Sequence, residues 1–198
     1  MADTIREQII GEAMQQINDH GTEFHMDDLA KNLRISKRTL YEHFSSKQEI
    51  IEETLRSLMD DVYQQHQQLI ADPTLTTEEK IIRFGRVRTR NITVLSVRKV
   101  NEVFHKVPGL CQKLEELHDK DFSLLSQLLD TAMEEEDFKP FDKFLILHML
   151  RSAADDIVEY FDDVERDYSF SEYMEKCIRV ILYGIKKDRG QSTNDTKE

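Results

Sequence analysis

The sequence has few of the residues that interrupt helices. Among its 198 residues there are only three prolines, six glycines and no tryptophan. Charged residues make up 33% and hydrophobic residues 39%, a balance that is typical of a helical chain and not of a sheet-rich one. A chain of this length can bury a sizeable core, either as one large domain or as a small and a medium domain.

Cysteines and long apolar runs are scarce as well. Cys111 and Cys177 stand alone, without the Cys-x-x-Cys spacing of a metal or redox site. No stretch approaches the roughly 18 apolar residues that cross a bilayer. The first ten residues, MADTIREQII, lack the apolar block of a secretory signal. We therefore expect reduced thiols, a cytoplasmic location and no membrane partner.

The charge is unevenly distributed along the chain. The formal net charge is −12, which by itself argues against a nucleic-acid binder. Between residues 31 and 47, however, five cations stand against one acid, Glu42, and the local net charge is +4. Salt screens charges beyond about 10 Å, so a basic patch on an acidic protein is compatible with DNA binding. The five cations are Lys31, Arg34, Lys37, Arg38 and Lys47.

Apolar residues recur at the spacing of amphipathic helices, and no window alternates in the manner of a strand. Four segments carry the Ser/Thr-x-x-Glu pattern of a capping box, at residues 4–7, 46–49, 76–79 and 169–172. The predicted fold is all-α with about nine helices, at residues 4–20, 26–33, 37–44, 46–71, 76–96, 99–106, 109–136, 141–166 and 170–187. The polar tail over residues 190–198 is expected to be disordered.

Residues 26–51 have the pattern of two short helices joined by a tight turn. Leu29 and Leu33 belong to the apolar face of the first helix, and Leu40 and Phe44, one turn apart, bury the second. Ser36 is a good N-cap for that second helix. The pattern predicts a helix-turn-helix at about residues 26–45.

Two cations, Lys37 and Arg38, occupy the first turn of the second helix. The helix macrodipole disfavours each of them there by a few tenths to about 1 kcal/mol. An anionic partner reverses this preference, and a recognition helix enters the major groove with this end leading. The alternative is a pair of solvated side chains on an exposed helix. The two-helix spacing and the aromatic residues Tyr41 and Phe44 favour DNA.

The stretch ISKRTLYEHFSSKQEII closely resembles the signature of the TetR family of bacterial helix-turn-helix regulators, and the match covers about residues 5–55. The resemblance implies a three-helix DNA-binding domain over residues 1–50 and a helical effector-binding and dimerisation domain over residues 51–189. Its implied partners are double-stranded DNA, at a palindromic operator, and a second copy of the chain. The matching DNA-binding positions are Ser36, Lys37, Arg38, Thr39, Tyr41, His43 and Lys47, with His43 near the backbone and Lys47 on a phosphate.

The chain departs from the family pattern at two positions. Arg34 stands in the turn where the family usually has glycine, and a left-handed residue other than glycine is uncommon. It would either bring another cation near the DNA or change the turn slightly. His25 replaces the usual threonine cap of the helix before the turn, and a neutral imidazole can accept one backbone N–H there.

The remainder of the chain resembles the family in architecture only. Family members dimerise through their last two helices, which implies an interface on residues 141–166 and 170–187. The candidate interface residues are Leu150, Ile157, Phe161, Cys177, Val180 and Ile181, although broad apolar faces of this kind could also be core.

An effector pocket among the middle helices is implied in the same way, lined by Phe84, Arg88, Ile92, Phe104 and Phe122. Arg88 falls among apolar residues of its helix. It either pairs with an acid of a neighbouring helix or anchors an anionic or polar effector, because an unpaired buried charge is too costly.

No enzyme signature is present: the chain has no Gly-x-Ser-x-Gly, P-loop or His-Glu-x-x-His motif. A metal sensor would need clustered His, Cys or carboxylate ligands, and no segment has that spacing. A third alternative, an interaction protein that has kept the fold but lost its pocket, stays open. The function that the sequence favours is a repressor released from DNA by a small-molecule effector, without catalytic residues, metal or cofactor.

Overall fold

The computed structural model describes residues 4–86, 97–159 and 170–186, and nine α-helices and one 3-10 helix lie in these ranges. They are α1 (Ile5–His20), η1 (Gly21–Glu23), α2 (Met26–Asn32), α3 (Lys37–His43), α4 (Lys47–Ala71), α5 (Thr77–Phe84), α6 (Val97–Lys106), α7 (Leu110–Glu134), α8 (Lys143–Glu159) and α9 (Phe170–Ile185). The described residues form no strand, only an isolated bridge between Phe138 and Lys186. The predicted all-α class is confirmed.

Side-chain caps start several helices where the sequence predicts them. Thr4 and Thr76 each close a full capping box, with Glu7 and Glu79 as the reciprocal partners. Ser46 caps α4 by accepting the N–H of Glu49 at 3.1 Å. The Glu49 carboxylate instead accepts from the N–H and hydroxyl of Ser45, so the predicted box at 46–49 is only half formed. The predicted box at 169–172 begins outside the described residues.

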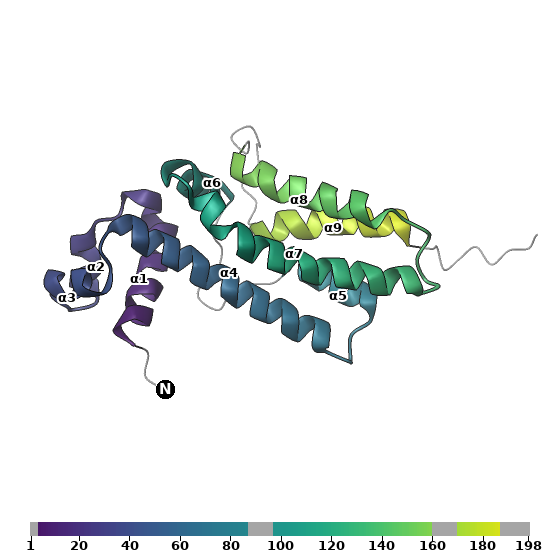
Figure 1. Ribbon diagram of the computed structural model, residues 1–198, viewed down its shortest axis with the longest axis horizontal. Helices are drawn as coiled ribbons and strands as arrows, with labels where there is room; N and C mark the ends of the chain where they lie inside the picture. Colours follow the sequence, from purple (N-terminus) through teal and green to yellow (C-terminus); the bar gives the residue numbers. More distant parts are fainter. Residues whose placement is uncertain (1–3, 87–96, 160–169, 187–198) are drawn as a thin grey trace, which may run out of the picture.

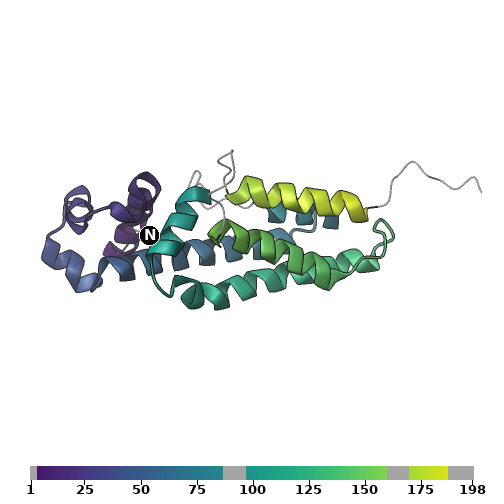
Figure 2. The same ribbon diagram turned by 90° about the horizontal axis from the view of Figure 1, so that it is seen from above.

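The helices form an elongated molecule (Figure 1). The short helices α1–α3 lie at one end, and α4 runs from them along the body. Helices α5, α7, α8 and α9 make up the body, and α6 lies between the two parts, as the view from above also shows (Figure 2). None of the helices in the described ranges is long and apolar enough to cross a membrane.

Two clusters of buried residues hold this arrangement. The first joins the N-terminal helices to α4, α6 and the start of α7, and includes Ile17, Phe44, Leu55, Val103 and Leu114. The second lies among α5, α7, α8 and α9. Because the first cluster continues into α6 and α7, the position of the N-terminal helices depends on the packing of the body.

Candidate nucleic-acid interface

The helix-turn-helix consists of α2, a four-residue turn and α3. The hydroxyl of Ser36 accepts the N–H of Thr39 at 3.0 Å, so Ser36 is the predicted N-cap. Leu40 and Phe44 are buried in the first cluster, and this fixes the opposite side of α3 as the outer surface. The apolar spacing of α3 therefore determines which residues can reach a ligand.

The two departures in this region have different outcomes. Arg34 keeps a left-handed backbone with φ of 56°, so the turn has the conformation that glycine would adopt. His25 occupies the N-cap position of α2 but makes no side-chain capping hydrogen bond. The bond that a neutral imidazole could accept there is not formed, and the His25 side chain is exposed.

The outer surface of α3 presents Lys37, Arg38 and Tyr41. The Arg38 side chain is 89% exposed, and its Nε lies 2.9 Å from Glu42 Oε1 one turn on. Lys37 Nζ lies 2.6 Å from Asp27 Oδ2 of α2. Exposed pairs of this kind contribute little stability, so phosphate could replace the carboxylates at small cost. Tyr41 is 53% exposed.

Thr39, His43 and Lys47, which are also predicted to bind DNA, are less accessible. Thr39 is half-buried, with its Oγ1 2.8 Å from the Ser36 hydroxyl. Lys47 is also half-buried, and its Nζ lies 4.6 Å from the centre of the Phe24 ring. Burial lowers the pKa of the Lys47 ammonium; Glu23 opposes the shift and Lys106 adds to it. Lys47 thus stabilises the packing of α4 on Phe24, and part of its side chain remains exposed to solvent.

Arg6 of α1 is part of this interface although the sequence analysis did not identify it. Its Nη1 donates to the carbonyl oxygen of His43 at 2.8 Å, and its guanidinium lies 4.2 Å from the centre of the Phe44 ring. A third contact joins its Nη2 to Glu53 of α4 at 3.4 Å. Arg6 therefore fixes the C-terminal end of α3. His43, whose carbonyl accepts this hydrogen bond, is 37 residues away in the sequence, so no local sequence pattern predicts the contact.

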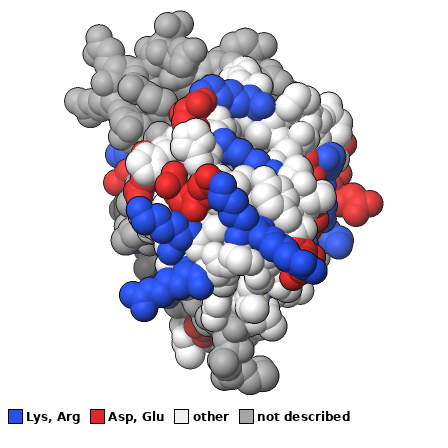
Figure 3. All heavy atoms as spheres, turned by 90° about the vertical axis from the view of Figure 1, so that its left-hand side faces the viewer, with Lys and Arg blue, Asp and Glu red and all other residues white. Residues whose placement is uncertain are grey.

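Lys and Arg side chains are prominent on the end of the molecule that the helix-turn-helix forms, with a few acids among them (Figure 3). The acids include Asp27 and Glu42, which pair with cations of α3. On a protein with a net charge of −12, a basic end of this kind can attract phosphates. The geometry therefore suits a DNA backbone with a groove beside it.

The three predicted effector-pocket residues that the structure describes do not all lie in the same cluster. Phe84 is buried in the second cluster and Phe122 packs against it, whereas Phe104 packs against the first cluster. Arg88 and Ile92 lie outside the described residues, so both predictions for Arg88 stay predictions.

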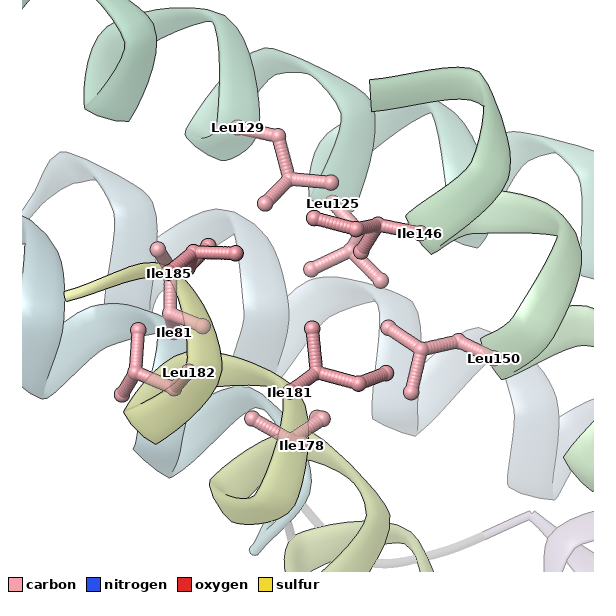
Figure 4. Close-up of a pocket in the computed structure, with 9 residues that line it drawn as sticks. All are labelled: Ile81, Leu125, Leu129, Ile146, Leu150, Ile178, Ile181, Leu182 and Ile185. Carbon is pink, nitrogen blue, oxygen red and sulfur yellow. The ribbon is translucent and has the colours of Figure 1, made fainter. Parts of the chain in front are cut away.

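A different, smaller pocket lies between α5, α7, α8 and α9 (Figure 4). Its volume is about 10 Å³, close to that of one water molecule. All of its lining side chains are aliphatic: Ile81, Leu125, Leu129, Ile146, Leu150, Ile178, Ile181, Leu182 and Ile185. A molecule that entered would need an apolar part and would have to push helices apart.

The predicted dimer residues differ in their exposure. Val180 is 75% exposed on α9 and is available to a partner. Cys177 and Ile181 are half-buried against the second cluster, and Leu150 is buried within it and has almost no surface left for a second chain. The side chain of Ile157 and the whole of Phe161 lie outside the described residues.

Other large apolar side chains of α8 and α9 are exposed as well, and together with Val180 they define an exposed apolar face. It includes Phe144, which is 78% exposed, and also Leu145, Met149 and Tyr183. None of these four residues was among the predicted interface residues, because α8 and α9 are each apolar on more than one side. The spacing of apolar residues along these helices could identify them only if the side that faces the core were already known.

Clusters of three or more potential metal ligands are missing from the part of the chain that the structure describes.

The helix-turn-helix segment matches a family model: residues 9–54 fit the model of the bacterial regulatory proteins of the tetR family. The chain therefore carries, over residues 9–54, the helix-turn-helix segment of the TetR family. It is a transcriptional regulator with the family's helix-turn-helix domain.

Relatives of this regulator match over almost its whole length. An uncharacterized HTH-type transcriptional regulator of Bacillus subtilis, YvaF, is 22% identical over 91% of this chain and 95% of its own. A transcriptional regulator of Saccharomonospora viridis, solved in complex with choline, has a TM-score of 0.70 at 18% identity, over 92% of this chain and 98% of that one. PfmR of Thermus thermophilus has a TM-score of 0.63 at 22% identity, over 90% and 99%. These similarities show a shared fold.

Proposed function

We propose that this TetR-family regulator is a homodimeric repressor that binds a palindromic operator and leaves it when a small molecule binds. The observation that carries the proposal is the exposed N-terminal end of α3, where Lys37 and Arg38 lie at the positive end of a helix dipole. A cation at that end is unfavourable without an anion, and DNA supplies one.

The exposed apolar face of α8 and α9 supports the dimer. Large apolar side chains such as Phe144 and Val180 are rarely grouped on a surface that stays in water. In a two-fold dimer the exposed apolar face of one protomer would pack against the same face of the other, so both faces would be covered. A dimer then carries two copies of α3, which matches a palindrome with half-sites about one DNA turn apart.

Release by an effector is supported by the position of the aliphatic pocket in Figure 4. Two of its walls, α8 and α9, carry the exposed apolar face on their other side. A molecule that separates these helices from α5 and α7 would shift the two protomers and change the spacing of the two α3 helices. Tenfold weaker DNA binding needs only about 1.4 kcal/mol of differential affinity. A solved structure of similar fold holds choline, so small-molecule binding is compatible with this architecture.

Selection of duplexes from a random pool by the purified protein tests the DNA function. The expected product is a palindrome with half-sites one helical turn apart, bound by protomers in pairs in sedimentation measurements. Transcription in vitro from a promoter that overlaps this site is expected to fall when the protein is added. No enriched sequence, or a single protomer bound tightly to a non-palindromic site, would contradict the proposal.

The effector is tested by adding choline and a series of straight-chain alkyl carboxylates to the protein bound to that duplex. We expect a compound with an apolar chain to release the DNA and to raise the melting temperature of the free protein. An Ile181→Trp variant fills the pocket and should bind the duplex without responding. Release that is equally strong in this variant would place the effector elsewhere.

A further inference from the structure

The turn of the helix-turn-helix contains a residue whose backbone conformation favours glycine. Arg34 is the only residue other than glycine with a positive φ in the parts of the chain that the structure describes. Its N–H donates to the carbonyl of Lys31 at 3.1 Å, and the next N–H, of Ile35, donates to the carbonyl of Ala30 at 3.0 Å. These two bonds after α2 form a Schellman motif, whose left-handed position is usually glycine and sometimes asparagine.

Arginine at this position is less stable than glycine would be, because the Cβ of an L-residue crowds the following carbonyl in the left-handed conformation. A cation beside the C-terminus of α2 recovers part of this loss through the helix dipole. That gain is small because α2 has only seven residues and Arg34 is exposed to water. Stability alone therefore does not account for an arginine in this turn.

The charge of Arg34 is available to an incoming anion. Arg34 is exposed and forms no ion pair with any residue in the described ranges. Lys37 and Arg38 differ in this respect, because each is paired with a carboxylate that DNA would have to displace. A phosphate that approaches the turn meets an arginine with all of its donors free of protein carboxylates.

The turn lies where DNA phosphates pass in this type of complex. In a helix-turn-helix the first helix crosses the DNA backbone, and the second enters the major groove by its N-terminal end. Arg34 stands between them, two residues before Ser36, the N-cap of α3. We propose that Arg34 binds a phosphate at the edge of the major groove and strengthens binding to DNA of any sequence. This inference rests on the proposed DNA-binding function.

Arg34→Gly and Arg34→Lys separate the charge from the turn conformation, because glycine fits the turn without charge and lysine keeps the charge. The probes are the duplex that the wild-type protein selects from a random pool and a scrambled duplex of the same length. Lys120→Gln is the control, since Lys120 is an exposed cation on α7 and its loss changes the net charge equally. Affinity is measured by fluorescence anisotropy over a range of salt concentrations, and the melting temperature of each protein is recorded.

We expect Arg34→Gly to bind both duplexes more weakly by the same factor, roughly tenfold, and the slope of log affinity against log salt to flatten by about 0.9 per bound protomer. Its melting temperature should equal or exceed that of the wild type, and Arg34→Lys and Lys120→Gln should bind much as the wild type does. Unchanged affinity and slope in Arg34→Gly would overturn the proposal, as would a loss confined to the selected duplex. A wild-type protein that selects no duplex would refute the proposed function itself, before any variant is made.

Discussion

The ammonium of Lys106, at the end of α6, lies 2.8 Å from a carboxylate oxygen of Glu23 in η1. It also lies 3.1 Å from Glu102 on its own helix. Gly21 packs against the same group so closely that a Cβ there would lie 2.6 Å from Glu102 Oε1. The hydrogen bond from Lys106 lowers the pKa of the Glu23 carboxyl, and the two carboxylates raise the pKa of Lys106. This contact joins the segment before the helix-turn-helix to the body.

Lys106→Gln should loosen η1 without unfolding the protein. Both side chains are exposed, so the melting temperature is expected to stay close to that of the wild type. Amide hydrogen exchange over residues 21–25 should become faster because the link to α6 is gone. Lys113→Gln is the matched control, since Lys113 is an exposed cation that pairs with Glu52 elsewhere. Exchange at η1 that is equally slow in both variants would show that this contact does not hold the segment.

Glu175 makes the free energy of unfolding depend on pH in the acidic range. It lies between Arg86 at 2.5 Å and Arg179 at 2.6 Å, and these partners lower the pKa of its carboxyl to about 2. A lowered folded pKa means that the stabilisation is complete above the ordinary value of 4.5 and is lost as the pH falls from there towards 2.

Glu175→Gln should therefore lose roughly 1 kcal/mol at pH 7 and show a smaller fall in stability between pH 4.5 and 2, because Arg86 is half exposed and screened by water. Urea denaturation at several pH values measures both effects. Glu115→Gln, on the exposed side of α7, is the control and should follow the wild type. An unchanged acid dependence in Glu175→Gln would contradict this role.

His66 joins three helices inside the body. Its ring stacks on Phe84 at a centroid distance of 3.5 Å, its Nδ1 lies 2.6 Å from Asp121 Oδ1, and its Nε2 lies 2.9 Å from the carbonyl oxygen of Phe84. Asp121→Ala leaves the buried Nδ1 without this partner and should lower the free energy of unfolding by about 1–3 kcal/mol. Asp119 lies on the same helix as Asp121 and forms an exposed pair with Arg151 of α8, so Asp119→Ala should cost much less. Equal losses in urea denaturation would show that the buried contact is unimportant.

Val180→Asp should prevent dimerisation without unfolding the protomer. The side chain is 75% exposed, so the charge disturbs no core packing, but it would have to be buried against a second copy. Sedimentation at micromolar concentration should give a monomer with a wild-type circular dichroism spectrum. Ile5→Asp, at the opposite end of the chain on α1, is the control and should stay dimeric. A dimeric Val180→Asp protein would remove α9 from the interface.

The starts of several helices were predictable because their caps are encoded locally, whereas the helix predicted over residues 76–96 ends at Phe84. Thr76 and Glu79 close a capping box whatever the rest of the chain does, and the apolar spacing of Leu40 and Phe44 fixes the outer side of α3. Where neighbouring groups compete, local patterns are less decisive. Glu49 turned to Ser45 because that residue offered both an N–H and a hydroxyl.

The interfaces of the body could not be predicted in the same way. Leu150 and Met149 are adjacent apolar residues of α8, and only the packing of α8 on its neighbours decides that Leu150 is buried and Met149 exposed. The contacts of Arg6 with α3 and α4 likewise depend on the tertiary arrangement and not on any local spacing.

We propose that the outer surface of α3 recognises a DNA sequence, and replacement of Arg38 is the sharpest test of that role. Its exposed guanidinium is held by Glu42 alone among the described residues, so Arg38→Ala removes a potential base contact without a packing defect. Glu42→Gln is the matched control, because it frees Arg38 and should preserve or strengthen binding. The measurement is the affinity of each protein for the selected palindrome and for a scrambled duplex. Arg38→Ala should lose about 1–3 kcal/mol on the palindrome and much less on the scrambled duplex. Wild-type affinity of Arg38→Ala for the palindrome would contradict the account.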